Sequence, residues 1–357
     1  MPLKGAIAGK HPKIEGFQSL VVMGRSAREM GYRLPAEFER QRAVLLTRLH
    51  NGETWPGGSL EKAQEEFEYF AETVAKYTRV RFVDELGFET TDSWIRDYGP
   101  ISMKRCDGRE SNQRLAGQGL MYQDFVFDGW GAKYDEKTAD DLIPQQFGLM
   151  DGVPMKVHDV ILEGGSIEVN GKGMLLTTEQ CLLNENRNAG MNRRELEGYL
   201  CEHLNVDDVV WLPGGITGDD TDGHVDDIAR FVSEDVVVAV TAEKGHADYE
   251  VLQANKCVLE GKGLEVVELP MPEVMTHEFP SGQPYDQAGK QVLPASYANF
   301  LITNGAIMVP MFGQKMDEVA LRVIEKAAPN YVIEPVPAKH LIVGMGSLHC
   351  LSMQVPW

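Results

Sequence analysis

A repeated order of secondary-structure elements constrains the fold of this chain more than any single motif. An amphipathic helix, an apolar strand, a polar or glycine-rich loop and a second apolar strand recur about five times, in units of roughly 50 to 75 residues. In the first unit Phe67, Phe70 and Val74 lie on one face of a predicted helix. The predicted helices are 61–77, 135–148, 193–204, 248–261 and 317–329, and the strands that follow them are 80–83, 155–162, 209–212, 264–270 and 331–337.

Two architectures fit this order of elements. The units can surround an axis as pseudo-symmetric blades, so that their loops meet at one end. An ordinary open α/β sheet also alternates helices and strands, and periodicity does not choose between the two. Two local details bear on single helices. Asn192 and Glu195 predict an N-terminal cap for helix 193–204, and the internal Pro144 weakens the prediction of helix 135–148. We expect one domain over residues 1–357.

The composition indicates a globular protein and excludes some partners. The chain has 43% apolar residues and no apolar run near the roughly 18 residues that a membrane-spanning helix needs. With 34 Lys and Arg against 54 Asp and Glu, its formal charge of −20 disfavours nucleic acid and anionic membranes and suits a cationic substrate. Without a signal-peptide pattern, a cytoplasmic location is expected. The five cysteines form no CxxC motif, so neither a zinc site nor a disulfide framework is predicted.

The loops between the repeated strands carry most of the residues suited to chemistry. If the loops converge, a thiol, an imidazole and several carboxylates share one pocket. The residues are Trp94, Arg96 and Asp97 in the first loop, Glu163 in the second, Asp220, His224 and Asp226 in the third, Asn299 in the fourth and Cys350 in the fifth.

The acidic stretch GDDTDGHVDD (218–227) has several interpretations. It is typical of a solvated turn, and its spacing fails as a calcium EF-hand because Gly218 stands at the first ligand position. A metal site on His224 and Asp226 has only two ligands. Catalysis is favoured because His224 and Asp226 would share one face of a predicted strand.

The other loops also have simple structural interpretations. Arg96 and Asp97 can form an ion pair under Trp94, and a lone cysteine such as Cys350 is more often a packed thiol than a nucleophile. The LEGGS stretch (162–166) allows close backbone approach but lacks the later glycine of a dinucleotide loop.

His349 and Cys350 are neighbours in GSLHCLS (346–352), which raises the question of a catalytic pair. The apolar pattern at Val343, Leu348, Leu351 and Met353 predicts a buried strand, on which successive side chains point to opposite faces. His349 would then be badly placed to activate the thiol. The base is expected from another loop, and His349 is interpreted as a packed or supporting residue.

Six stretches together resemble the agmatine deiminases, a family of the guanidine-modifying superfamily that also holds bacterial peptidylarginine deiminases and arginine deiminases. They are GYRLPAEFE (31–39), DSWIRDYGP (92–100), LEGGSIEVNGKGMLLTTEQCLLNENRN (162–188), WLPGGITGDDTDGHVDDIARFV (211–232), PASYANFLITNGAIMVPMFG (294–313) and GSLHC (346–350). The resemblance covers nearly the whole chain. It implies a five-bladed α/β propeller, the pentein fold, and a hydrolase that needs no metal or other cofactor.

The resemblance also implies a reaction and roles for named residues. Agmatine and water would give N-carbamoylputrescine and ammonia through a covalent intermediate on the cysteine, a step of polyamine metabolism. The implied nucleophile is Cys350, the general acid and base is His224, and the guanidinium-binding carboxylates are Asp97 and Asp226. Trp94, Glu163, Asp220 and Asn299 are expected to bind substrate. A homo-oligomer, a dimer or a tetramer, is compatible with the family.

Two departures from the family pattern bear on substrate choice. The family has a tryptophan-rich stretch where this chain reads AVLLTRLHNGETWPG (43–57), and GMGSLH precedes the cysteine where the family has a glycine pair and an asparagine. A deiminase of free or peptidyl arginine therefore stays as an alternative. Two rivals of other classes also stay: a noncatalytic polyamine- or guanidine-binding propeller, and an amidinotransferase that would use an acceptor amine instead of water.

Overall fold

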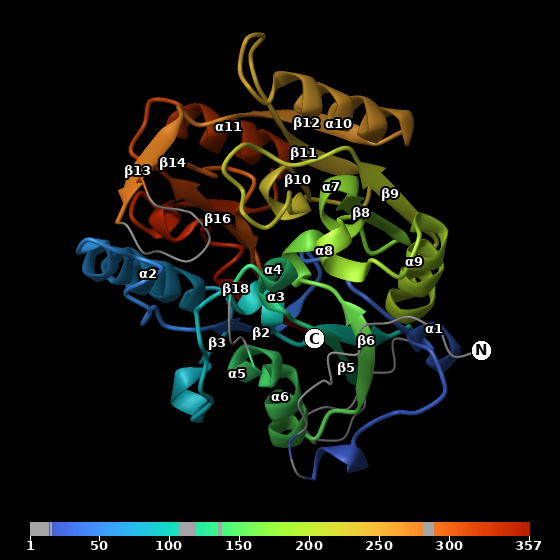
Figure 1. Cartoon of the computed structure of the whole chain (residues 1–357). Helices are drawn as coiled ribbons and strands as arrows, with labels where there is room; N and C mark the ends of the chain where they lie inside the picture. Colours follow the sequence, from blue (N-terminus) through green and yellow to red (C-terminus); the bar gives the residue numbers. More distant parts are fainter. Residues whose placement is uncertain (1–13, 15, 107–118, 135–137, 281–288) are drawn as a thin grey trace.

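The computed structural model describes residues 14, 16–106, 119–134, 138–280 and 289–357, and it contains five similar three-stranded arrays placed around a centre (Figure 1). In each array the middle strand pairs antiparallel with one neighbour and parallel with the other. The arrays, with the middle strand second, are β18 (Ser352–Pro356), β2 (Gln41–Leu46), β3 (Val80–Phe82); β4 (Ile101–Arg105), β5 (Leu120–Val126), β6 (Met155–Ile161); β7 (Glu168–Val169), β8 (Met174–Thr178), β9 (Asp208–Leu212); β10 (Ala229–Phe231), β11 (Val236–Thr241), β12 (Glu265–Pro270); and β15 (Leu301–Ile302), β16 (Ala306–Met311), β17 (Val332–Pro337). β1 (Tyr32–Arg33) extends the second array, and β13 (Met275–Phe279) pairs with β14 (Gly289–Leu293).

A helical crossover joins the two parallel strands of each array, as parallel pairing requires. The crossover helices are α2 (Ser59–Ala75), α5 (Thr138–Asp141) with α6 (Ile143–Asp151), α9 (Arg193–Leu200), α10 (Tyr249–Gly261) and α11 (Asp317–Ala327), and they lie on the periphery (Figure 1). The repeated unit predicted from the sequence is confirmed as a blade of an α/β propeller. The alternative of a single open sheet is wrong.

Shorter helices lie mostly in the connections. They are α1 (Ala27–Met30), α3 (Ile95–Tyr98), α4 (Gly129–Ala132), α7 (Glu179–Leu182), α8 (Glu185–Asn188), the 3₁₀ turns η1 (Phe17–Ser19), η2 (Asp84–Leu86), η3 (Gly164–Ser166), η5 (Val225–Asp227) and η7 (Leu341–Gly344), and the π-helical turn η4 (Cys201–Asn205).

The last strand closes the ring on the first array. β18 pairs with β2 so that Ser352 faces Leu46 and Met353 faces Leu45. Each predicted polar loop therefore connects one blade to the next, from β3 to β4, β6 to β7, β9 to β10, β12 to β15 and β17 to β18. This topology brings loops distant in sequence to the middle of the ring.

Several local predictions can now be compared with the structure. Asn192 and Glu195 form the predicted capping box of α9. The predicted helix 135–148 is two helices, because Pro144 lies in the first turn of α6, where no backbone N–H is needed; residues 135–137 lie outside the described residues. The strand predicted around Cys350 is wrong for residues 341–351, which form η7 and a turn, and β18 begins at Ser352.

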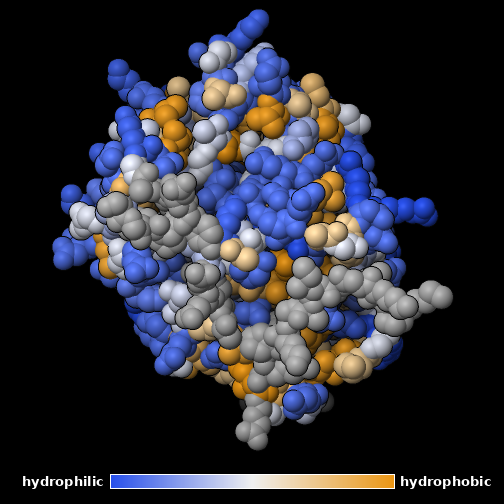
Figure 2. Space-filling view, viewed as in Figure 1, coloured by the Kyte–Doolittle hydropathy of each residue, from blue (hydrophilic) through white to orange (hydrophobic). Residues whose placement is uncertain are grey.

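Buried apolar residues of all five blades form one contiguous core. Figure 2 shows that hydrophilic residues cover much of the face seen in Figure 1 and gather in its upper middle, where α7 and α8 lie. Among the described residues, no helix combines the length and the apolar character needed to span a membrane.

Candidate active site

Cys350 lies in the turn that precedes β18, with 7% of its surface exposed. Asn299 holds this turn: its Nδ2 donates to Cys350 Sγ at 3.0 Å, and its Oδ1 accepts from the backbone N–H of His349 at 3.0 Å and of Cys350 at 3.4 Å. Asn299 Nδ2 also donates to Asp227 Oδ1 at 3.0 Å. The thiol is therefore fixed by a side chain from the preceding loop, and that side chain offers it a hydrogen bond that suits a thiolate.

Trp94 packs directly against the turn that carries Cys350. A Cβ placed on Gly346 would lie 2.6 Å from the Trp94 ring and 3.1 Å from Cys350 Cβ, so only glycine fits there. Trp94 also stacks on Trp55, with ring centroids 5.3 Å apart. Trp55 belongs to the stretch that departs from the family pattern, and that stretch reaches the site through this ring pair.

His224 and Asp226 come from the loop between β9 and β10. Asp226 lies in η5 and His224 just before it, so the prediction that they share a strand face is wrong; β10 begins only at Ala229. They converge all the same. A Cβ placed on Gly165 would lie 2.6 Å from His224 Nδ1, 2.8 Å from Asp97 Oδ1 and 3.1 Å from Asp226 Oδ2.

Asp97 is the third group at this point of convergence. It lies in α3, 5% exposed, and its two oxygens accept from the backbone N–H of Gly165 and from Trp130 Nε1, each at 2.9 Å. His224 Nδ1 lies 3.7 Å from Asp97 Oδ1. The simple ion pair between Arg96 and Asp97 is not what forms: Arg96 instead pairs with Glu37 at 3.2 Å and donates to the backbone oxygen of His349.

Glu163 and Asp220 lie at different depths. Glu163 is fully buried, with Oε1 bonded to Arg187 Nε at 2.7 Å, while its Oε2 has no hydrogen-bond partner among the described residues. Asp220 is half-buried, its side chain accepts from the Tyr134 hydroxyl, and its backbone oxygen accepts from Lys133 Nζ. The structure therefore brings together Cys350, His224, Asp97, Asp226, Asn299, Glu163 and Trp94, and it shows Asp220 bound to Tyr134 and Lys133.

Burial and like charge govern the ionisation of the site. Burial raises the pKa of the Cys350 thiol well above its usual value, and the carboxylates of Asp226, Asp227 and Asp97 raise it further. Burial and then Asp226 likewise raise the pKa of Asp97. Burial lowers the pKa of His224 to about 3 against the opposing charge of Asp226, so its imidazole is neutral near pH 7. A bound cation would favour the thiolate and both carboxylates.

Within the described part of the chain, two trios of donor atoms have the spacing of metal ligands. The donor atoms of Glu163, Cys181 and His224 lie within 4.8 Å of one another, as do those of Asp226, Asp227 and Cys350. Arg187 already neutralises Glu163, and Asn299 already donates to Cys350. We therefore assign neither trio to a metal, and a reaction without metal stays a prediction.

Sequence reasoning missed several residues that contact the site. Trp130 binds Asp97, Asp227 binds Asn299, and Glu37 binds His349 at 2.7 Å. Glu37 lies within GYRLPAEFE, one of the six stretches that resemble the family, so the sequence marked this segment but assigned no role to Glu37. His349 was interpreted as a packed or supporting residue, and it is a hydrogen-bonded neighbour of Asp226 at 2.6 Å.

The five-bladed ring is shared with solved deiminase structures. The agmatine deiminase of Enterococcus faecalis superposes with a TM-score of 0.84 at 29% identity, over 94% of this chain and 98% of that one. A cysteine-to-serine variant of C. jejuni agmatine deiminase with substrate bound gives a TM-score of 0.78 at 30% identity, over 91% of this chain and 96% of that one. The fold thus defines an α/β propeller of the pentein class.

The chain belongs to the Porphyromonas-type peptidyl-arginine deiminase family, whose model matches residues 33–356. A relative from Latilactobacillus sakei, provisionally named an agmatine deiminase, is 33% identical over 368 residues, which cover 93% of this chain and 98% of that protein. A relative from Mycoplasma capricolum with the same provisional name is 32% identical over 369 residues, covering 94% of this chain and 98% of that protein.

Proposed function

We propose that this protein is an agmatine deiminase, a hydrolase that converts agmatine and water to N-carbamoylputrescine and ammonia by covalent catalysis on Cys350. One observation carries the proposal: a buried thiol, an imidazole and two carboxylates form one cluster, in which Cys350 Sγ lies 3.7 Å from Asp226 Oδ2, and Asp226, Asp97 and His224 all pack against Gly165. A guanidinium is a planar cation that two carboxylates can hold through charge-assisted, paired hydrogen bonds. The names of the relatives in the same family support agmatine as the substrate.

Substrate binding prepares the nucleophile in this proposal. In the free enzyme Asp226 and Asp97 hold Cys350 as a thiol, because a thiolate beside them would be repelled. The guanidinium neutralises these carboxylates, so the Cys350 proton can pass to His224, both of whose ring nitrogens lack a hydrogen-bond partner among the described residues. Asn299 Nδ2 stabilises the resulting thiolate. The thiolate therefore forms only when substrate is present.

The reaction then has two halves. The Cys350 thiolate attacks the guanidinium carbon, and the tetrahedral intermediate collapses when protonated His224 gives its proton to the leaving nitrogen, which departs as ammonia. A covalent amidino-thioether, a thiouronium, is left on the sulfur. Neutral His224 next accepts a proton from water as the water attacks this carbon. Collapse of the resulting tetrahedral intermediate breaks the C–S bond, its hydroxyl proton passes through solvent to the released ammonia, and N-carbamoylputrescine leaves. Protonated His224 then returns its proton to the Cys350 thiolate.

Positioning is the main contribution of the other groups. Asp97 is held by Gly165 and Trp130, and Asp226 is held by His349, so the carboxylates do not need to reorganise when substrate enters. Orientation of this kind can supply roughly 7 to 11 kcal/mol of barrier reduction in favourable cases. We further propose that Trp94, Glu163 and Asp220 serve the substrate channel, whose aromatic and acidic character suits the distal amine of agmatine.

Ammonia release from three substrates tests the proposal. Agmatine, arginine and a blocked arginyl peptide are offered to the wild-type chain and to Cys350→Ser, with turnover of agmatine by the wild type alone as the expected result. Turnover of arginine or the peptide but not agmatine would refute the substrate assignment. Full activity of Cys350→Ser would refute the covalent mechanism. Mass spectrometry of the product distinguishes hydrolysis from amidino transfer to an amine.

We also propose that residues 1–357 act as one catalytic domain in the cytoplasm, needing no cofactor, and assemble as a homo-oligomer. The family match over residues 33–356 supports the single domain. Size-exclusion chromatography with light scattering measures the assembly, and a monomeric mass would contradict it.

A further inference from the structure

A chain of hydrogen bonds runs from Asp226 through His349 to Glu37. His349 Nδ1 lies 2.6 Å from Asp226 Oδ2, and His349 Nε2 lies 2.7 Å from Glu37 Oε2. All three side chains are buried. Glu37 comes from the segment between β1 and β2, 312 positions before His349. Glu37 and His349 have no step of their own in the mechanism above.

The two short contacts of His349 determine how many protons the cluster holds. A neutral imidazole has one N–H and one lone pair, and a lone pair facing a carboxylate oxygen at hydrogen-bond distance is repulsive. Both nitrogens of His349 face carboxylate oxygens. An imidazolium that donates to both satisfies every atom, with charge-assisted bonds of the short length observed. The geometry therefore favours a positively charged His349 between two negative carboxylates.

Glu37 is anchored independently of His349, so it can fix the imidazolium. Its Oε1 accepts from Arg230 at 2.9 Å and from the backbone N–H of Ile302 at 2.7 Å, and its Oε2 also accepts from Arg96 at 3.2 Å. Burial tends to raise the pKa of Glu37, but Arg230, His349 and Arg96 together hold it well below its usual value. Glu37 thus stays ionised.

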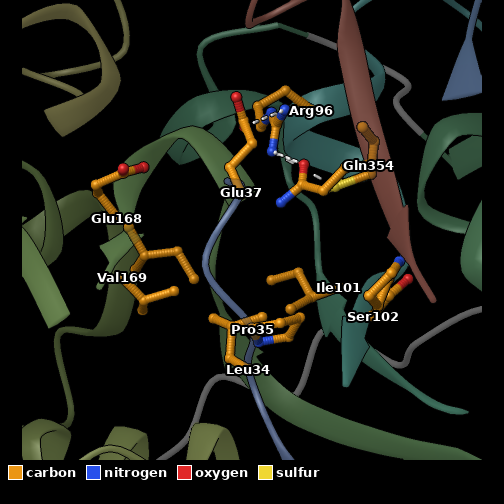
Figure 3. Close-up of a pocket in the computed structure, with 13 residues that line it drawn as sticks. Leu34, Pro35, Glu37, Arg96, Ile101, Ser102, Glu168, Val169 and Gln354 are labelled. Atoms are coloured by element: carbon orange, nitrogen blue, oxygen red, sulfur yellow. Dashed lines mark hydrogen bonds and ion pairs between the residues drawn. The ribbon is translucent and has the colours of Figure 1, made fainter. Parts of the chain in front are cut away.

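A small pocket of about 40 Å³ adjoins this anchor; Glu37 and Arg96 line it, and Asp226 does not. Figure 3 shows Glu37 and Arg96 at one end of the pocket, with the Arg96 contacts to Glu37 and Gln354 as dashed lines, and Leu34, Pro35 and Ile101 toward the other end. Glu168 also lines it and accepts from Arg230 Nε at 3.2 Å. Glu168 therefore belongs to the same buried array as Glu37 but makes no hydrogen bond to His349 among the described residues.

Asp226 is surrounded by groups of both signs besides His349. It faces His224, Asp219 and Asp227 from its own loop, and Asp97, Cys350, Arg96 and Arg230 from other segments. Burial and then Asp226 itself raise the pKa of Asp97 and of Asp227. Burial also works to raise the pKa of Asp226, yet the hydrogen bond and charge of His349, with smaller help from His224 and Arg230, lower it. Asp226 Oδ2 is bonded to His349 and also accepts from the Cys350 thiol at 3.7 Å, and Asp226 Oδ1 has no hydrogen-bond partner among the described residues.

We propose that Glu37 and His349 are positioning residues that keep Asp226 ionised and oriented, with Oδ1 directed at the substrate guanidinium. The inference rests on the proposed role of Asp226 in binding that guanidinium. His349 makes the direct contact, and Glu37 acts through it by holding both the position and the charge of the imidazole. One carboxylate of a crowded acidic site is thereby ionised before the substrate arrives.

The pH dependence of kcat/KM separates this role from a purely structural one. Glu37→Gln and His349→Gln keep roughly the side-chain volume. His349→Gln removes the positive charge next to Asp226, and Glu37→Gln removes the carboxylate that holds that charge. The acid limb of kcat/KM for agmatine should therefore move up by about one pH unit or more, which is a loss of about tenfold at a pH below that limb. Glu168→Gln is the matched control, because it removes another buried carboxylate that binds Arg230 and interacts with His349 through charge alone, without a hydrogen bond to it, so its shift should be smaller. An unshifted acid limb in both test variants, or an equal shift in Glu168→Gln, overturns the proposal.

A second measurement does not depend on activity. Nitrogen-15 NMR of the full wild-type chain with labelled histidine reports whether each ring nitrogen carries a proton. At pH 7 to 8 one histidine is expected to have both nitrogens protonated, and its signal should disappear in His349→Gln. A wild-type spectrum in which every histidine has an unprotonated ring nitrogen at that pH overturns the proposal, whatever the substrate. Failure of agmatine turnover with this signal present would refute the proposed function alone.

Discussion

Replacing Gly165 with alanine tests the geometry of the site most directly. Gly165 is not at a positive φ, so its backbone does not require glycine, and only the surrounding atoms do. An added Cβ would lie 2.6 Å from His224 Nδ1 and 2.8 Å from Asp97 Oδ1, and ordinary contact begins at 3.4 Å. Each of these groups must therefore retreat by something approaching 1 Å. A displacement of that size costs about 100-fold in rate, or about 2.7 kcal/mol of transition-state stabilisation.

Steady-state ammonia release and thermal unfolding measure the two effects of Gly165→Ala. We expect kcat/KM for agmatine to fall by about 100-fold or more, and the free energy of unfolding to fall by about 1 to 3 kcal/mol from overpacking. Gly198→Ala is the control, because nothing lies within 4 Å of its added Cβ on α9; it should leave the rate unchanged and add about 0.5 to 1 kcal/mol of stability. Wild-type kcat/KM in a folded Gly165→Ala protein would refute the convergence of His224, Asp97 and Asp226 on this point.

Three further outcomes follow from the thiol and its surroundings. Cys350→Ser should abolish detectable ammonia release, while Cys257→Ser, at an exposed position on α10, should retain it; equal activity of the two variants in the same assay would exclude Cys350 as the nucleophile. Burial, and then the neighbouring Asp226, raise the pKa of the Cys350 thiol, so its thiolate is scarce at neutral pH and its alkylation by iodoacetamide in the free enzyme should accelerate as pH rises through 9 and above. Mass spectrometry of the labelled peptide checks this, and rapid alkylation that does not change between pH 7 and 9 would contradict the raised pKa. Prolonged dialysis against EDTA should leave kcat unchanged, because the proposed steps use only the thiol, the imidazole and the carboxylates; a loss restored by a metal ion would overturn the metal-free mechanism.

The amino-acid sequence was sufficient to predict the number and composition of the repeated units. Amphipathic helices such as 61–77 and apolar strands such as 264–270 depend on local periodicity, which a sequence displays directly. The same holds for the cap at Asn192, where two residues three positions apart form the contact. Local rules failed around Cys350, where apolar residues at strand spacing pack into a turn because Asn299, from a different blade connection, binds the backbone there.

The identity of the candidate site residues was also accessible from the sequence, through the six stretches that resemble the family. Their arrangement was not. Cys350 stands 51 positions from Asn299, which donates to its sulfur, and His349 stands 123 positions from Asp226. Only the closed ring of blades, completed by β18 on β2, brings such distant segments within hydrogen-bond distance.

Charge is the property that tertiary structure decided most completely. In the sequence Asp97, Asp226, Asp227 and Glu37 are four ordinary acids. In the fold, burial and mutual repulsion raise the pKa of Asp97 and Asp227, while contacts with His349 and with arginines lower the pKa of Asp226 and Glu37. The free energy of a buried charge depends on which opposite charges lie within a few ångströms, and that is set by contacts between residues far apart in the chain.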